Sequence, residues 1–319
     1  MIGTTLGGYK LIELIGKGGM AHVYKASDPT VKRHVAIKVL LPDYADDEEF
    51  RARFDREAET IARLEHLHIL PLHAYGEQDG TLYLVMRYMP HGTLNDLIKA
   101  GPMNLQDAAR ILAQLASALD YAHQFGVLHR DMKPANVLLD GDRNIYLTDF
   151  GLAKSVSPDE TSMTGQFIVG TPHYMSPEQC RAQDLTPAAD QYGLAAMLYY
   201  MVTGQVPFNG KNALAIMRQQ ILDEPKPPVD LRPDMPKAAS DAIVKSLHKE
   251  PSGRYPSCTA LAVAFSQAVD PQVRSKIDNS SVPRQLRNRI TDALSSFDDD
   301  SDNDNDDPTK ARRTQVSER

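Results

Sequence analysis

Four polar residues near the middle of this 319-residue chain have types and spacing that could carry chemistry. Asp131, Lys133 and Asn136 fall within one short stretch, and Asp149 follows thirteen residues after Asn136. Carboxylate and amide oxygens suit Mg²⁺, a hard cation that prefers oxygen ligands. Phosphoryl transfer needs a carboxylate to hold the incoming hydroxyl, metal ligands, and a cation near the moving group. These residues therefore favour phosphoryl transfer.

A glycine cluster near the N-terminus could approach a phosphate group. The segment Gly16-Lys17-Gly18-Gly19-Met20-Ala21 follows one expected strand and enters another. Its glycines would let backbone N–H groups come close to a triphosphate. By itself the segment is equally consistent with an ordinary glycine-rich hairpin. It opens no helix, as a dinucleotide-binding loop would, and it lacks the Gly-Lys-Ser/Thr end of a Walker loop.

The first 88 residues predict a small lobe that positions this glycine segment. Charged residues alternate with apolar ones at helical spacing over 47–64, which predicts one main amphipathic helix. Period-two alternation predicts five antiparallel strands, at about 9–15, 22–25, 35–39, 70–75 and 82–88. We therefore expect residues 1–88 to form a five-stranded sheet with one helix.

From residue 89 to 270 the pattern becomes helical and predicts a larger, mostly α-helical lobe. Residues 192–202 are nearly all apolar, as in a helix that is buried on every side. Amphipathic or bounded helices are expected at about 105–125, 213–222, 237–247 and 257–268. The fold class is then α+β, with two lobes in one chain.

The C-terminal segment 271–319 is expected to be a largely disordered acidic tail. The chain has a net charge of −7, and the seven aspartates within 298–307 account for that excess. The tail could be a solvating spacer, a docking segment for a basic partner, or an autophosphorylation region; we favour the spacer. Neither the tail nor the body has the basic excess of a nucleic-acid binder.

The remaining composition predicts a soluble cytoplasmic protein. Cys180 and Cys258 are far apart in the sequence, which supports neither a disulfide framework nor a zinc ribbon. The apolar run 192–202 is well short of the roughly 20 residues that span a bilayer, so no membrane segment is expected. The N-terminus shows neither a signal peptide nor a myristoylation site.

The string His129-Arg130-Asp131-Met132-Lys133-Pro134-Ala135-Asn136, with Asp149-Phe150-Gly151 after it, resembles a known signature. It is similar to that of eukaryotic-like (Hanks-type) bacterial serine/threonine protein kinases, and the resemblance covers about residues 9 to 268. Any one Asp or Asn alone would suit a loop or a helix cap, but the whole set at this spacing would not. The resemblance implies a bilobal kinase fold and phosphorylation of Ser/Thr hydroxyls on proteins, including autophosphorylation.

The resemblance implies a role for each polar residue. Asp131 would orient the substrate hydroxyl and accept its proton, and Lys133 would reach the γ-phosphate. Asn136 and Asp149 would hold Mg²⁺, for which Mn²⁺ could substitute. Lys38, at the end of an expected strand, would contact the α- and β-phosphates of ATP.

Glu57 is the expected carboxylate partner of Lys38, and Glu59 is the competing choice. On a helix Glu57 shares a face with Phe54 and Ile61, whereas Glu59 lies about 200° away, towards solvent. We therefore choose Glu57.

The resemblance also implies a nucleotide site between the lobes. Met86 would line the back of the adenine pocket, and the backbone of Arg87 and Met89 would read the base. Arg87 departs from the acidic residue often found there. The expected ATP-binding residues, besides Lys38 and Asp149, are Ile15, Gly16, Lys17, Gly18, Gly19, Met20, Ala21, Val23, Ala36, Met86, Arg87, Met89 and Leu138.

Arg130 resembles the arginine that in many kinases is held by a phosphorylated activation loop, which implies control by phosphate. The candidate phosphosites are Thr161, Ser162 and Thr164, and Thr164 is favoured by its distance from Gly170. Thr171 would hydrogen-bond the catalytic loop, which is the string 129–136. Its alternative role is that of an inhibitory phosphosite.

Several further residues resemble structural positions of the family. The segment 170–178 resembles the one that docks the substrate residue after the phosphoacceptor, and Glu178 would form a buried ion pair with Arg254. Asp190 would accept hydrogen bonds from the catalytic loop backbone. His129 would pack beneath Phe150 rather than act as a base.

Two other classes of function compete with an active protein kinase. A pseudokinase acting as a binding or scaffold module would normally lack the strand lysine or a catalytic aspartate, and here Lys38, Asp131 and Asp149 are present. A small-molecule kinase would tend to lack the segment 171–178. By family analogy alone, phosphothreonine-binding domains are expected partners, and transient homodimers are expected as well.

Overall fold

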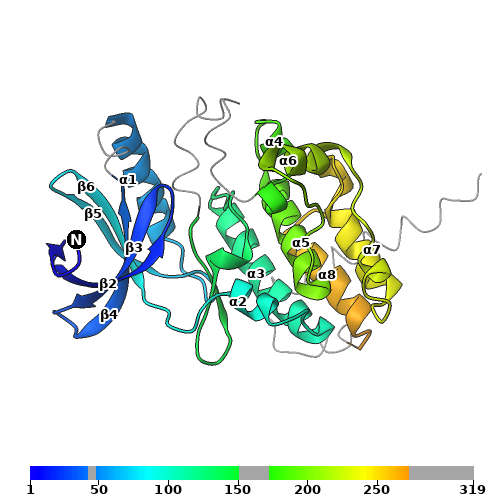
Figure 1. Cartoon of the computed structure of the whole chain (residues 1–319), viewed down its shortest axis with the longest axis horizontal. Coiled ribbons are helices and arrows are strands. Elements are labelled where there is room, and N and C mark those ends of the chain that lie inside the picture. The colour runs from blue at the N-terminus through cyan, green and yellow to red at the C-terminus, as the bar shows by residue number, and fades with distance from the viewer. Residues whose placement is uncertain (42–47, 151–171, 273–319) are drawn as a thin grey trace, which may run out of the picture. The chain divides into compact units, whose positions relative to one another are not determined.

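The computed structural model describes residues 1–41, 48–150 and 172–272, and Met1–Pro271 forms one compact unit. Within this unit a β-sheet lobe is followed by a helical lobe (Figure 1). The predicted bilobal α+β architecture is confirmed. Among the described residues, no helix combines the length and apolar character needed to span a bilayer.

The small lobe is a six-stranded antiparallel sheet with strand order β1-β2-β3-β4-β6-β5. One helix, α1 (Glu48–Ala62), accompanies it. The strands are β1 (Thr5–Leu6), β2 (Tyr9–Lys17), β3 (Ala21–Asp28), β4 (Arg33–Leu40), β5 (Leu72–Gln78) and β6 (Thr81–Arg87).

The prediction of five strands was wrong by one, because β1 was not expected. Its two residues, Thr5 and Leu6, are too few to show a period-two pattern. The turn from β1 into β2 uses Gly7 and Gly8, whose φ angles of 57° and 86° favour glycine. The turn between β5 and β6 likewise has positive φ, at Asp79 and Gly80, as tight hairpins require.

Helix α1 packs on the sheet through the apolar positions that the sequence placed on one face. Phe50, Phe54 and Ala58 are all buried and share a cluster with Leu82 and Leu84 of β6. Their spacing of four residues puts them on one side of the helix. This contact fixes the rotation of α1 and therefore which of its residues face the lysine strand β4.

The large lobe contains one two-stranded hairpin and, in its described part, seven α-helices. The hairpin pairs β7 (Val137–Leu139) with β8 (Ile145–Leu147). The helices are α2 (Leu94–Lys99), α3 (Leu105–Gln124), α4 (Pro177–Cys180), α5 (Pro187–Thr203), α6 (Ala213–Leu222), α7 (Lys237–Ser246) and α8 (Cys258–Val269).

Helix α5 is the centre of the large lobe. Almost every residue from Ala189 to Val202 is buried, as the continuous apolar run predicted. Pro187 in its first turn lacks an N–H that would be unpaired there anyway, and Gly204 ends the helix with a φ of 72°. Because α5 is surrounded, polar residues on it can hold several other elements at once.

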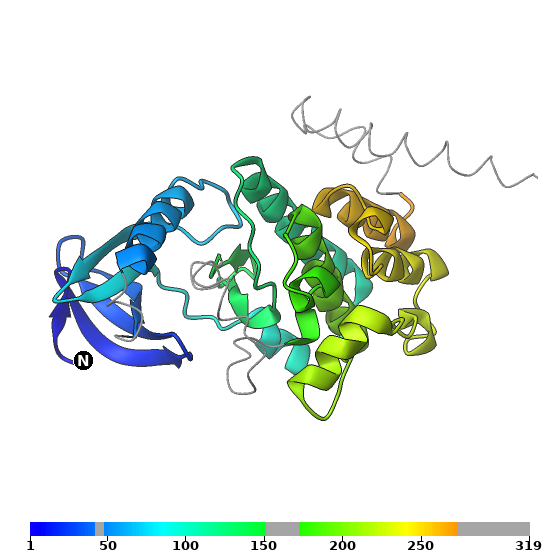
Figure 2. The same cartoon turned by 90° about the horizontal axis from the view of Figure 1, so that it is seen from above.

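Among the described residues, a chain segment and a set of backbone hydrogen bonds join the lobes. The segment Tyr88–Thr93 leads from β6 to α2. On the other side, the chain before β5 pairs with β8: Leu147 N donates to the His68 carbonyl at 2.8 Å, and Leu70 N donates to the Leu147 carbonyl at 2.9 Å. Figure 2 shows the small lobe, with α1 beside the strands, at one end of this unit and the helical lobe at the other.

Candidate active site

Asp190 in the first turn of α5 anchors the catalytic loop, as predicted. Its Oδ2 accepts a hydrogen bond from His129 N at 2.8 Å, and its Oδ1 accepts one from Arg130 N at 2.8 Å. Burial raises the pKa of Asp190, but hydrogen bonds and the nearby His123 lower it by a larger amount. The pKa therefore lies below its usual value. Asp190 therefore binds the loop as a carboxylate.

Arg130 has a left-handed backbone that needs this support. Its φ is 62°, a conformation that costs a residue other than glycine of order 1–3 kcal/mol. The N–H is held by Asp190, and the carbonyl accepts a hydrogen bond from Gln179 Nε2 at 2.8 Å. The loop is thus fixed from α5 on one side and from α4 on the other.

His129 is a structural residue, as expected. It is 0% exposed, and its Nε2 lies 2.9 Å from the Thr148 carbonyl. Its ring packs against Phe150, with centroids 4.8 Å apart. Burial lowers the pKa of His129, so the ring is neutral. His129 therefore joins the catalytic loop to the chain around Asp149.

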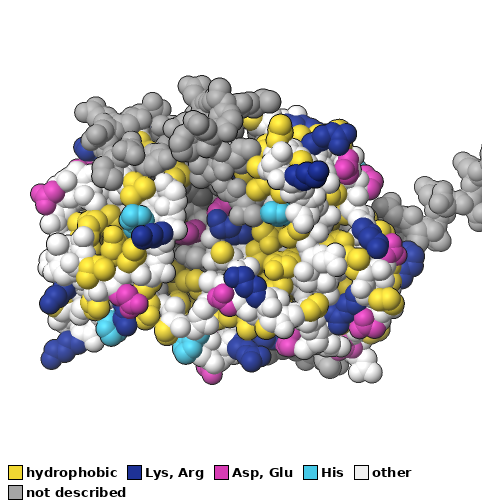
Figure 3. Space-filling model, in the orientation of Figure 1, with side chains coloured by type: hydrophobic (Ala, Val, Ile, Leu, Met, Phe, Trp, Pro, Cys, Tyr) yellow, Lys and Arg dark blue, Asp and Glu magenta, His cyan; other side chains and the backbone are white. Residues whose placement is uncertain are grey.

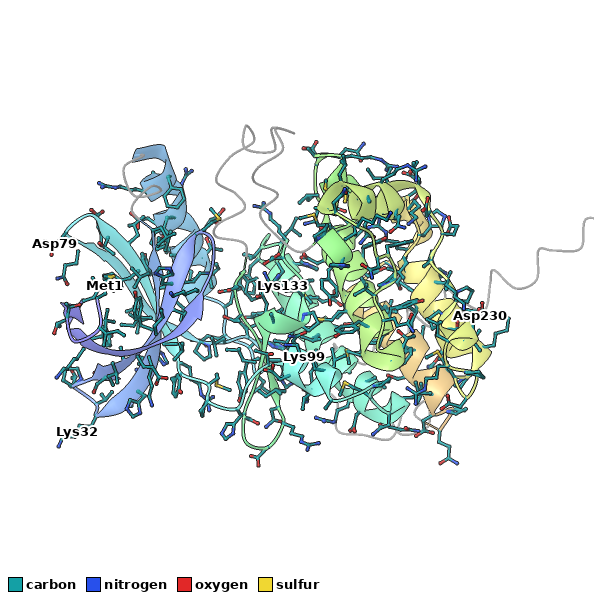
Figure 4. The ribbon with its side chains drawn as sticks, in the orientation of Figure 1. Met1, Lys32, Asp79, Lys99, Lys133 and Asp230 are labelled. Carbon is teal, nitrogen blue, oxygen red and sulfur yellow. The ribbon has the colours of Figure 1, made fainter. Side chains whose placement is uncertain are left out.

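Asp131, Lys133 and Asn136 form one hydrogen-bonded group. Lys133 Nζ lies 2.6 Å from Asp131 Oδ2, and Asn136 Nδ2 donates to the same oxygen at 3.1 Å and to the Asp131 carbonyl at 2.8 Å. The Asp131 carboxylate is therefore oriented, and a cation stands beside it. In Figure 4 the labelled Lys133 comes from the part of the large lobe nearest the small lobe.

Asp149 connects the two lobes through Lys38. Lys38 Nζ on β4 donates to Asp149 Oδ1 at 2.9 Å, and the side chains are 19% and 34% exposed. Burial raises the pKa of Asp149, but the Lys38 charge and hydrogen bond lower it below the usual value. Asp149 also has a positive φ, 61°, which marks a second strained backbone position in the site.

The residues predicted to hold a metal ion have a suitable donor set. Thr148 N donates to the Asn136 carbonyl at 3.0 Å, so Asn136 lies next to the strand end that carries Asp149. The two side-chain hydrogen bonds described above for Asn136 use the amide nitrogen, so the amide oxygen is the atom that could serve as the predicted metal donor. One amide oxygen and one carboxylate fit a hard divalent cation.

Glu57 and Glu59 differ in exposure in the way the helical argument predicted. Glu57 is half-buried on α1, and Glu59 is exposed and pairs with Arg63 four residues on. The ion pair of Lys38 with Glu57 stays a prediction.

Sheet register places several of the expected nucleotide residues on neighbouring strands. Gly16 pairs with Val23 across β2 and β3, Val23 pairs with Lys38, and Ala36 pairs with Met86. In the space-filling view the surface is hollowed between the two lobes (Figure 3). The other expected members lie as follows: Ile15 and Lys17 on β2, Ala21 on β3, Arg87 on β6, Leu138 on β7 of the large lobe, Gly18, Gly19 and Met20 in the β2–β3 turn, and Met89 after β6.

The glycine segment forms a closed hairpin. Gly18 N donates to the Ala21 carbonyl at 2.9 Å, and a side chain at Gly18 would stand 3.2 Å from that oxygen. At the back of the site Met86 is buried beside Thr148. The Arg87 guanidinium lies 5.1 Å from the centre of the Tyr146 ring, so its side chain joins β6 to β8.

The predicted ion pair in the docking region is confirmed. Arg254 NH1 and NH2 bind Glu178 Oε1 and Oε2 at 2.7 and 2.8 Å, and the two side chains are 0% and 6% exposed. Three backbone carbonyls accept the other Arg254 hydrogen bonds. A buried, fully paired arginine of this kind fixes the start of α4.

The predicted regulatory residues Thr161, Ser162, Thr164 and Thr171 lie outside the described residues. The sequence analysis missed three long-range contacts. His123 binds Asp190, Gln179 binds the Arg130 carbonyl, and Gln220 binds the Pro172 carbonyl, away from the catalytic loop. Each meets its partner across 48 to 67 residues of chain, so no local pattern indicated the contact. The only local signal was for His123, which lies three residues after Asp120 on one helix face.

Comparisons with known proteins agree with this geometry. The family model described as protein kinase domain matches residues 9–266. The chain is 38% identical over 272 residues to the serine/threonine-protein kinase PrkC of Bacillus subtilis (strain 168), an alignment that covers 85% of this chain and 42% of PrkC. It is 39% identical over 270 residues to PknD of Mycobacterium tuberculosis, covering 84% and 40%. The chain thus spans about two fifths of these curated relatives.

A solved structure shows the same fold. The crystal structure of the Mycobacterium tuberculosis PknI kinase domain is 34% identical, with a TM-score of 0.68, and the match covers 84% of this chain and 99% of that one. The family match covers the region that contains Lys38, Asp131, Asn136 and Asp149. The chain belongs to the protein kinase family, among the serine/threonine protein kinases of bacteria.

Proposed function

We propose that this chain transfers the γ-phosphoryl group of ATP to serine and threonine hydroxyls of protein substrates. One observation carries the proposal: the Asp131 carboxylate is held by Lys133 and Asn136, and Asp149 is held 2.9 Å from Lys38. Use of ATP and a divalent metal is general in the family. Between the metals, we favour Mg²⁺, because the donors are oxygens; Mn²⁺ would substitute.

In the proposed mechanism each residue either positions a reacting group or neutralises charge on the phosphates. Asp131 holds the substrate hydroxyl in line with the γ-phosphate and finally takes its proton. Lys133, 2.6 Å from that carboxylate, can turn to the transferring oxygen atoms. A bound metal ion would supply charge neutralisation at the phosphates, held by Asn136 and Asp149. The rate enhancement then comes mainly from orientation and preorganised charge.

A protein substrate is favoured over a small molecule by the segment that ends at Glu178. Its α4 is capped by Ser176, which accepts a hydrogen bond from Gln179 N, and is fixed by the Glu178–Arg254 pair. A rigid surface beside the catalytic loop supports docking of an extended chain. A scaffold role without catalysis is not favoured, since Lys38, Asp131 and Asp149 are all present.

The direct test is incubation of the purified chain with labelled ATP and Mg²⁺, followed by mapping of the phosphorylated residues. We expect label on serine or threonine. Asp131→Asn should abolish transfer and keep nucleotide affinity, because the change removes a proton acceptor and leaves Lys38 and Asp149 in place. Asp142→Asn, at an exposed carboxylate in the β7–β8 turn, is the matched control. Substantial transfer by Asp131→Asn would refute the assignment.

We also propose that phosphate on Thr164 or its neighbours controls activity through Arg130. The support is the position of Arg130, held rigidly next to Asp131 by Asp190 and Gln179. A phosphate near a guanidinium forms charge-assisted hydrogen bonds that can order a loop. Mass spectrometry of active enzyme that finds no phosphate on Thr161, Ser162 or Thr164 would refute this part.

The proposed organisation is an ATP-binding lobe over 1–88, a substrate lobe over 89–270 and a tail from 271. Phosphothreonine-binding domains and transient homodimers are proposed partners on family analogy alone. Analytical ultracentrifugation across protein concentrations would test the homodimer.

A further inference from the structure

Gln220 is a buried glutamine on α6, and both atoms of its amide bind other elements. Its Oε1 accepts a hydrogen bond from the Tyr192 hydroxyl at 2.5 Å, and its Nε2 donates to the Pro172 carbonyl at 2.9 Å. Gln220 and Tyr192 are 0% exposed, and Pro172 is buried as well. A buried amide is costly unless both ends are paired, so these contacts define one orientation of the side chain.

Pro172 opens the described part of the segment that we propose docks the substrate. It begins a short 3-10 turn, Pro172–Tyr174, and α4 begins three residues after that turn, at Pro177. Within the segment, the Pro172 carbonyl accepts only the long hydrogen bond from Met175 N, at 3.3 Å. The bond from Gln220 is shorter and comes from a different helix, so it sets the position of this end of the segment.

The other end of the segment is held through the same tyrosine. Glu178 is bound by Arg254, and the Arg254 guanidinium lies 4.9 Å from the centre of the Tyr192 ring. Tyr192 therefore contacts both residues that hold the segment: Gln220 through its hydroxyl and Arg254 through its ring. Burial raises the pKa of Tyr192, which keeps the hydroxyl a donor.

The two ends of the segment are not held equally. At Glu178 a bidentate charged pair is supported by three carbonyl groups. At Pro172 the hydrogen bond from outside the segment comes from one neutral amide, the side chain of Gln220. Because a neutral hydrogen bond contributes less than a charged one, the Pro172 end should respond more readily to a single substitution.

We propose that Gln220 is a positioning residue for the protein substrate: from α6 it fixes the Pro172 end of the docking segment and so sets the affinity for the acceptor. The inference rests on the proposed function. The side chain of Gln220 binds Tyr192 and Pro172, and neither belongs to the residues proposed for catalysis or for ATP binding. Its removal should therefore act on the acceptor and spare the ATP site.

The test compares Gln220→Met with Gln219→Met in the full chain. Methionine has a similar length but forms no such hydrogen bonds. Gln219 is the matched control because it precedes Gln220 on the same helix and its side-chain oxygen has no hydrogen-bond partner among the described residues. A degenerate peptide library with a central Ser or Thr identifies the acceptor peptide of the wild type. The KM for that peptide, the KM for ATP and the acceptor-free rate of ATP hydrolysis are then measured.

We expect Gln220→Met to raise the peptide KM about fivefold, the effect of one buried hydrogen bond, with ATP KM and ATP hydrolysis unchanged. Gln219→Met should leave all three values unchanged. Adding Tyr192→Phe to Gln220→Met should have no further effect on the peptide KM, because the hydroxyl acts through Gln220. A peptide KM equal to that of the wild type, or a parallel change in the ATP constants, would overturn the inference. A wild type that labels no peptide would instead contradict the proposed function.

Discussion

His123 lies between two carboxylates and connects three helices of the large lobe. Its Nε2 is 2.8 Å from Asp190 Oδ2 on α5, and its Nδ1 is 3.8 Å from Asp120 Oδ1 on its own helix, α3. Asp120 in turn accepts hydrogen bonds from Cys258 N and Thr259 N at the start of α8. The side chain of His123 is only 8% exposed. Its charge should therefore matter for the stability of the folded chain.

Burial lowers the pKa of His123, but the hydrogen bonds and charges of Asp120 and Asp190 raise it by a larger amount. The resulting pKa is about 9. In the unfolded chain the pKa is about 6.5. The difference corresponds to about 3 kcal/mol of folding free energy. Since the folded pKa is the higher one, this contribution is complete below pH 6.5 and is lost as pH rises through 9. Between these values the free energy of unfolding should fall by about 1.4 kcal/mol per pH unit.

The other groups that face His123 do not titrate in this window. The pKa values of Asp120 and Asp190 lie below their usual range despite burial, so both are charged throughout. Burial raises the pKa of Cys258 well above its usual value, so the thiol stays neutral. Burial also lowers the pKa of His129, which is therefore neutral across the same range.

The assay is urea unfolding followed by circular dichroism from pH 6 to 9.5, because the chain has no tryptophan for fluorescence. His123→Gln should lower the free energy of unfolding at pH 6.5 and flatten its dependence on pH. His66→Gln is the matched control, because burial lowers the pKa of His66 and that residue is neutral above pH 7. Parallel pH curves for the wild type and His123→Gln would refute the assignment of a charged His123.

Three other substitutions test separate parts of the site. Glu178→Gln leaves the Arg254 charge buried without its partner and should lower the free energy of unfolding by about 3–5 kcal/mol in urea. Gly193→Ala would place a Cβ 2.8 Å from Met132 Cβ in the catalytic loop, so kcat should fall about tenfold to a hundredfold while the ATP KM is kept. Lys38→Met removes the cation beside Asp149 and should reduce kcat at least about a hundredfold in the labelled-ATP assay.

The tests at Glu178 and Gly193 each have a clear contrary result. For the ion pair, the control is Lys237→Met, which breaks an exposed pair with Asp241 and should change stability by less than about 0.5 kcal/mol. Equal losses for the buried and exposed pairs would contradict the burial argument. An unchanged kcat in Gly193→Ala would show that the catalytic loop tolerates a methyl group beneath Met132.

The sequence was sufficient for the longer elements whose cause is local. Helix α6 has the predicted bounds 213–222, because its apolar spacing, the Asn212 cap and the flanking polar residues act within a few residues. The buried helix α5 was likewise predicted from its continuous apolar run. The two ends of the Glu178–Arg254 pair were assigned only because a family signature supplied the long-range partner.

The left-handed conformations of Arg130 and Asp149 show what the sequence could not supply. Glycine would have signalled a positive φ, but an arginine does not, and an aspartate adopts it only occasionally. The strain persists because distant groups hold it: Asp190 and Gln179 bind the backbone of Arg130, and Lys38 binds the Asp149 carboxylate. Such contacts depend on how helices and strands pack, and packing is not periodic in the chain. The residues proposed to do the chemistry could therefore be selected from spacing and family resemblance, whereas the residues that hold them in position required the structure.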